Sequence, residues 1–90
     1  MTELEKYRQE IDGIDQELTR LVEQRFDVAK KVANYKIAHD LPVLDASREE
    51  VVIKRNQDRL EQPEYQDEIA DFFTQLMAIS RGIQEKLIGK

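Results

Sequence analysis

An apolar heptad runs through the first forty positions of the chain. Counted from Leu4, one seam position is occupied by Leu4, Ile11, Leu18, Arg25, Val32 and His39, and the other by Tyr7, Ile14, Leu21, Val28 and Tyr35. This period predicts one long helix that pairs with another helix along the seam. Thr2 and Glu5 have the spacing of a capping box, so we expect the helix to occupy about residues 2–39.

The heptad breaks at Pro42, and we expect a loop over residues 40–45. Proline disfavours the helical conformation for the residue before it, which is Leu41. Asp45 is a suitable N-cap for a second helix, which we expect to occupy about residues 46–62.

A third helix is predicted to begin at Pro63, because proline is favoured in the first turn of a helix. Apolar residues then recur every three or four positions at Tyr65, Ile69, Phe72, Leu76, Ile79, Ile83 and Leu87. The helix should occupy about residues 63–88. Three helices, long, short and long, predict an all-α fold in which residues 1–90 form one domain.

The first predicted helix is too long for the rest of the chain to cover. At about 1.5 Å per residue it exceeds 50 Å. We therefore expect part of its seam to meet a second copy of the chain in an interlocked helical homodimer.

Composition narrows the possible functions. The chain has no cysteine and one histidine, which excludes disulfides and thiolate or multi-histidine metal sites. Its 19 acidic and 14 basic residues give a net charge of -5, which argues against nucleic acid as the main partner. The N-terminal sequence lacks a signal-peptide core, and no segment approaches the roughly 20 apolar residues that span a membrane. We expect a cytoplasmic protein that binds neither membrane nor nucleic acid.

Two cations interrupt or flank the apolar seam. Arg25 and Lys36 are eleven residues apart, close to three helical turns, so they project from nearly the same side about 16 Å apart. Arg25 could set the register of a coiled coil while Lys36 is simply solvated. Together they favour a cationic groove. Arg8 lies 17 residues before Arg25, about 25 Å away, so a small ligand could reach both only if a second, antiparallel chain supplied Arg8.

Other polar residues stand beside apolar faces. Asp45, Arg48 and Glu49 could converge where the second helix begins, although ordinary capping also explains acidic residues there. On the third helix Ser80 and Gln84 lie one turn apart beside the apolar stripe. Ser80 could also be satisfied by a carbonyl of its own helix.

In chain order these residues resemble the all-helical AroQ class of chorismate mutases, in its small stand-alone form. The resemblance covers the whole chain. It includes Arg-x-x-Ile-x-x-Ile-Asp from Arg8 to Asp15, the Glu23 and Arg25 pair, Lys36 before the loop, and Pro-Val-x-Asp-x-x-Arg-Glu from Pro42 to Glu49. The ordered set is specific, although each piece alone is weak.

The resemblance implies an intertwined homodimer in which the long first helices pair antiparallel and each active site takes Arg8 from the other subunit. It implies conversion of chorismate to prephenate by an intramolecular [3,3] rearrangement, a step in the biosynthesis of aromatic amino acids. No metal, cofactor or covalent intermediate is expected.

The resemblance also implies a role for each site residue. Lys36 and Gln84 would stabilise the charge that grows on the ether oxygen. Arg25 and the partner's Arg8, helped by Ser80, would bind the substrate carboxylates. The ring hydroxyl would be held by Glu49, with Arg48 and Asp45 nearby. The catalytic residues expected are Lys36, Gln84, Arg25 and Glu49.

Two other functions fit parts of the pattern. A related helical lyase, which removes pyruvate from isochorismate, shares the fold and the cationic groove, but Glu49 after Arg48 favours the mutase. A non-enzymatic helical dimer would explain the heptad alone. Arg81 departs from the commoner family pattern, and because a helical step turns about 100° from Ser80 we expect it to face solvent.

Overall fold

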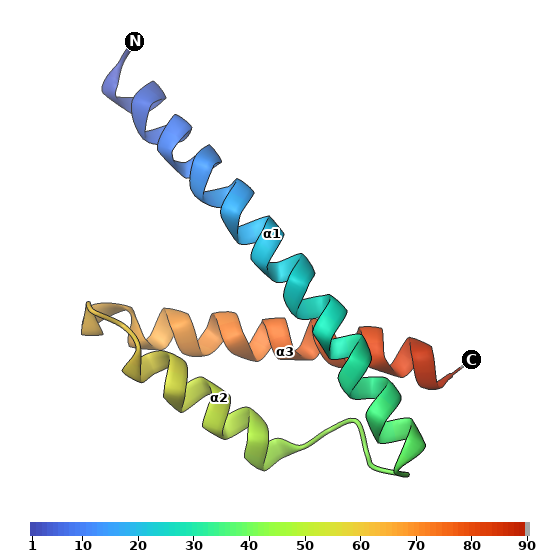
Figure 1. Cartoon of the computed structure of the whole chain (residues 1–90). Helices are drawn as coiled ribbons and strands as arrows, with labels where there is room; N and C mark the ends of the chain where they lie inside the picture. Colours follow the sequence, from blue (N-terminus) through green and yellow to red (C-terminus); the bar gives the residue numbers. More distant parts are fainter. Residues whose placement is uncertain (90) are drawn as a thin grey trace.

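The computed structural model describes residues 1–89 as helices and connecting turns, without a strand in that range. The elements are α1 (Glu3–Ala38), α2 (Ala46–Asp58), the 3-10 helix η1 (Pro63–Tyr65) and α3 (Gln66–Ile88) (Figure 1). The all-α fold with a long, a short and a long helix is confirmed. None of these helices is both long and apolar enough to cross a membrane.

Local sequence fixes both ends of α1. The Thr2 hydroxyl accepts a hydrogen bond from the Glu5 amide at 3.2 Å, as the capping spacing predicts. At the other end Asp40 adopts a left-handed conformation with φ of 54°. The Leu41 amide then donates to the Lys36 carbonyl at 2.8 Å and the Asp40 amide to the Ile37 carbonyl at 3.3 Å. This is a Schellman motif, which satisfies carbonyls that the helix end leaves free.

The second helix is shorter than the predicted 46–62, because α2 ends at Asp58. Pro63 requires an extended conformation at Gln62, which has φ of -112° and ψ of 101°. The chain must also reverse direction before α3, so it leaves the helix several residues before the proline. The third helix was likewise predicted too long at its start: residues 63–65 form the turn η1, and α3 begins at Gln66.

The helices form two layers that meet on α3. In Figure 1, α2 runs beside α3, and the C-terminal half of α1 crosses α3. The buried apolar side chains are Ala29 and Ala33 of α1 and Leu76 and Met77 of α3. The small alanines allow α1 to approach α3 closely, so the crossing point becomes the centre of the core.

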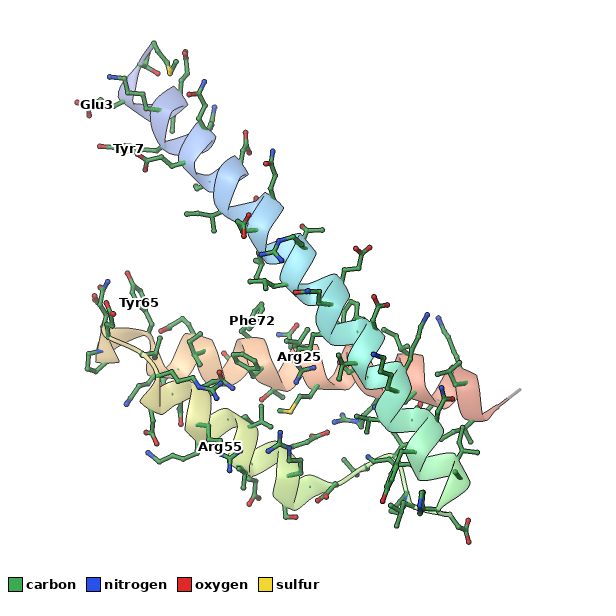
Figure 2. All side chains as sticks on the ribbon, viewed as in Figure 1. Glu3, Tyr7, Arg25, Arg55, Tyr65 and Phe72 are labelled. Carbon is green, nitrogen blue, oxygen red and sulfur yellow. The ribbon has the colours of Figure 1, made fainter. Side chains whose placement is uncertain are left out.

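The N-terminal half of α1 extends away from the other helices, with Tyr7 on its free part (Figure 2). Every residue from 1 to 21 is exposed. The seam residues from Leu4 to Leu21 are among them, and Ile14 retains 63% of its accessible surface. A row of exposed aliphatic residues of this length is typical of an interaction surface. The dimer expected from the heptad stays a prediction.

Candidate active site

A cavity of about 300 Å³ opens where α1, α2 and α3 come together with the loop between α1 and α2. Seven of the eight site residues expected from the sequence line it: Arg25, Lys36, Asp45, Arg48, Glu49, Ser80 and Gln84. The eighth, Arg8, lies on the exposed N-terminal half of α1 and does not line the cavity. One chain therefore brings together all the expected residues except Arg8.

Arg25 lies between α1 and α3 (Figure 2), where its Nη1 donates a hydrogen bond to the Ser80 hydroxyl at 3.1 Å. Ser80 in turn donates to the Leu76 carbonyl at 2.9 Å, so its own helix satisfies it and it still fixes the guanidinium. Burial, followed by the charge of Arg48, lowers the pKa of Arg25. Among residues 1–89 no carboxylate pairs with Arg25, so its charge is available to an anionic ligand.

Lys36, in the last turn of α1, connects that helix to the loop. Its Nζ donates to the Val43 carbonyl at 2.7 Å. An ammonium group has three donors, so two remain for a ligand. The bond also holds the loop against α1, and Asp45 at the end of this loop lines the cavity.

Asp45 is the N-cap of α2. Its Oδ1 accepts from the Ser47 hydroxyl at 2.8 Å and from the Arg48 amide at 3.1 Å. The Ser47 hydroxyl lowers the pKa of Asp45 most, and the Arg48 amide and the charge of Lys36 lower it further. The capping function considered from the sequence is thus present in a residue that also lines the cavity.

Gln84 is buried on α3 and reaches across to the backbone of α1. Its Nε2 donates to the Ala29 carbonyl at 3.0 Å. A larger side chain than Ala29 at the crossing would separate the two helices and lengthen this bond. The amide has a second N–H, which remains for a ligand.

Arg81 does not face solvent as expected from its position after Ser80. It lines the cavity and forms an ion pair with Glu49, and the two side chains are 29% and 26% exposed. α2 packs against α3, and the helical step from Ser80 points Arg81 toward Glu49 on α2. The sequence pattern did not contain this contact, since it depends on where α2 packs.

The cavity is positively charged in an acidic chain. Its wall carries four cations, Arg25, Lys36, Arg48 and Arg81, and two carboxylates, Asp45 and Glu49, which leaves a formal charge of +2. The whole chain has a charge of -5. A local excess of cations in a partly enclosed space attracts a small anion, and two uncompensated positive charges match a dianion.

Apolar residues that the sequence analysis did not assign to the site complete the wall: Val28, Ala29, Val32, Val43, Val52 and Met77. Val28 and Val32 were assigned to the helical seam alone. Their spacing from Arg25, three and seven residues along the same helix, is the signal that could have found them.

Most of the chain matches a known protein family. The family model described as chorismate mutase type II matches residues 7–85. This chain belongs to the chorismate mutase type II family. All eight expected site residues lie inside the matched range, so the family and the cavity concern the same part of the chain.

A curated relative agrees with the family assignment. The chain is 36% identical over 55 residues to a bifunctional chorismate mutase/prephenate dehydratase of Aquifex aeolicus (strain VF5). The matched segment is 61% of this chain and 15% of the relative's length. The chain thus corresponds to a small part of that larger protein.

Proposed function

We propose that this chain catalyses the rearrangement of chorismate to prephenate in the biosynthesis of aromatic amino acids. The observation that carries the proposal is the cavity with a charge of +2, lined by seven residues of the chorismate mutase pattern. Chorismate carries two carboxylates, so its charge matches that of the wall. Membership of the family supports the same reaction.

Orientation would supply much of the rate. The [3,3] rearrangement needs both ends of one molecule in contact, and holding reacting groups in that geometry removes a large entropic barrier. Arg25 is fixed by Ser80 before any ligand arrives, so it presents a rigid guanidinium to one carboxylate. A planar fork of donors binds a carboxylate through two parallel hydrogen bonds.

Stabilisation of charge would supply the rest. As the ether bond breaks, negative charge grows on its oxygen, and donors aimed there stabilise the transition state more than the ground state. Lys36 and Gln84 suit this task, because each is anchored by one hydrogen bond and retains another N–H. Glu49 would accept a hydrogen bond from the ring hydroxyl, with Arg48 and Asp45 beside it.

The proposed site is completed by a second subunit. Arg8 and Arg25 are 17 residues apart on one continuous helix, which is about 25 Å. The exposed seam on the N-terminal half of α1 would pair antiparallel with the same helix of another copy, and the partner's Arg8 would then reach the cavity. This dimer would also cover apolar residues that one chain leaves exposed.

A direct assay tests the activity. The purified protein is mixed with chorismate, and the loss of chorismate and the appearance of prephenate are followed by absorbance. A parallel reaction with isochorismate monitors pyruvate. We expect prephenate from the first reaction. Pyruvate from isochorismate without prephenate from chorismate would identify the lyase instead. If neither substrate gave a product, the non-enzymatic helical dimer would be the remaining hypothesis.

A further inference from the structure

Arg81 is a pocket residue to which the proposed mechanism assigns no role. It lies on α3, one position after Ser80, and its guanidinium donates to Glu49 on α2. The two residues are 32 positions apart in the chain, so the pair connects two helices across the cavity. Neither side chain is fully buried or fully exposed, which makes the pair accessible to a ligand.

The charged residues that share the cavity wall with Glu49 are mostly cations. Arg48 precedes it on α2, Asp45 caps the same helix, Arg25 and Lys36 line the cavity from α1, and Arg81 reaches it from α3. Of the four cations, Arg81 is the one with which Glu49 forms an ion pair among residues 1–89. The structure thus holds Glu49 on the side of the cavity formed by α2 and α3.

The position of Glu49 matters because a carboxylate can neutralise a neighbouring cation. If Glu49 turned toward Arg25 or Lys36, it would compete with the substrate for the groups that bind its carboxylates and stabilise its ether oxygen. Arg81 occupies one oxygen of Glu49, Oε2, and leaves the other available to accept a hydrogen bond. It also adds one positive charge, without which the formal charge of the wall falls from +2 to +1.

We propose that Arg81 is a positioning residue that holds the Glu49 carboxylate away from Arg25 and Lys36 and directs its free oxygen toward the ring hydroxyl of the substrate. This inference rests on the proposed function, because it assigns Glu49 to the substrate. Arg81 acts through Glu49, so its effect on the reaction depends on the presence of that carboxylate.

A double-mutant cycle tests the dependence. The four proteins are the wild type, Arg81→Met, Glu49→Gln and the double variant, and kcat and KM for chorismate are measured for each. We expect Arg81→Met to lower kcat/KM about tenfold, mainly through kcat, since a partly exposed charged pair contributes modestly. In the Glu49→Gln background the same change should alter kcat/KM less than about twofold. In the protein that keeps Glu49, Arg81→Lys should retain more activity than Arg81→Met.

Lys54→Met is the matched control. Lys54 also forms an ion pair, with Asp58 at 2.8 Å, but on the exposed surface of α2 outside the cavity. We expect it to keep wild-type kinetics. The midpoint of thermal unfolding is measured for every variant, and if Arg81→Met unfolds, Arg81→Gln replaces it in the cycle.

Several results would overturn the inference. Equal losses in both Glu49 backgrounds would show that Arg81 acts independently of Glu49. A rise in KM alone would indicate direct binding of substrate by Arg81, and a gain in kcat/KM would show that the pair obstructs the cavity. An active wild type with an equally active Arg81→Met overturns only this inference, whereas an inactive wild type overturns the proposed function and this inference with it.

Discussion

Single side chains in this pocket combine a structural contact with free hydrogen-bonding capacity. Lys36 holds the Val43 carbonyl, Gln84 holds the Ala29 carbonyl and Ser80 holds Arg25. Each contact uses part of the polar group and fixes its direction. Donors fixed before the ligand binds need no reorganisation during the reaction, which is the condition for strong electrostatic stabilisation of a transition state.

Lys36→Ala tests whether a donor that is fixed before the ligand binds stabilises the transition state. Loss of a donor to the developing charge should lower kcat by about two to three orders of magnitude. Lys30→Ala is the control, because Lys30 is exposed on the same helix and does not line the cavity. Kinetics and thermal unfolding are measured for both. Wild-type turnover in Lys36→Ala would remove Lys36 from the site.

Asp45→Ala tests whether the ionised N-cap of α2 stabilises the fold, through the pH dependence of thermal unfolding. The Ser47 hydroxyl and the Arg48 amide lower the pKa of Asp45 in the folded chain, so ionised Asp45 stabilises the fold above the carboxyl's unfolded pKa. That stabilisation is lost as the pH falls through the lower, folded pKa. We expect Asp45→Ala to unfold at a lower temperature than the wild type at pH 7. The difference should shrink below about pH 4. A difference that does not vary with pH would contradict the ionic cap.

At the scale of elements, α1 has two apolar faces with different surroundings. The face that carries Ala29 and Ala33 packs on α3 inside one chain, while the seam that carries Ile14 and Leu18 stays exposed. Arg25, Val28 and Val32 belong to the predicted seam and line the cavity as well. The C-terminal half of α1 is therefore a pocket wall, and its N-terminal half is free to contact another molecule.

Ile14→Glu tests the seam. In an antiparallel α1 pair this change would bury an unpaired carboxylate from each subunit, which should weaken the dimer at least about tenfold. Sedimentation velocity over a range of concentrations measures the effect. Gln16→Glu is the control, since two helical steps place it about 200° away from Ile14. Equal sedimentation of wild type and Ile14→Glu as monomers would contradict the proposed dimer.

Asp40→Gly tests the end of α1. Asp40 has φ of 54°, a conformation that glycine adopts without the steric cost of a side chain. We expect the free energy of unfolding to rise by about 0.5 to 1 kcal/mol. Urea denaturation measures it. Asp40→Val should shift stability in the opposite direction, because β-branched residues strongly disfavour this region.

At the scale of the whole molecule, one chain supplies a cavity with seven of the eight expected residues and an arm that carries the eighth. The chain extends over 55 Å along its longest axis, and α1 accounts for most of that length. An arm of this length is suited to reach the cavity of a second copy. The same seam would then build the interface and deliver Arg8.

Mixing two inactive variants tests the shared site. In a heterodimer of Arg8→Ala and Lys36→Ala, one cavity would have Lys36 together with the partner's intact Arg8, while the other would lack both. Random exchange of subunits should therefore restore about a quarter of wild-type activity. Fluorescent labels monitor the exchange. A mixture that exchanges subunits but stays inactive would contradict the shared site.

Much of the fold follows from local sequence. The capping spacing at Thr2, the break at Pro42 and the N-cap Asp45 act over a few residues, so they could be recognised without knowing the packing. The end of α2 at Asp58 and the start of α3 at Gln66 could not be recognised in this way, because they depend on how the chain turns to pack α3 against α2.

The helical class, the order of the helices and the periodic cations could be predicted from the sequence, because helical spacing along one chain converts directly into distance and direction. Three features became clear from the packing of the helices: Arg81 faces Glu49, Gln84 reaches the backbone of α1, and Val28 and Val32 line a cavity. Each of these features depends on how different helices pack against one another. Their geometry depends on crossing angles and distances that the packing of side chains such as Ala29 and Ala33 sets.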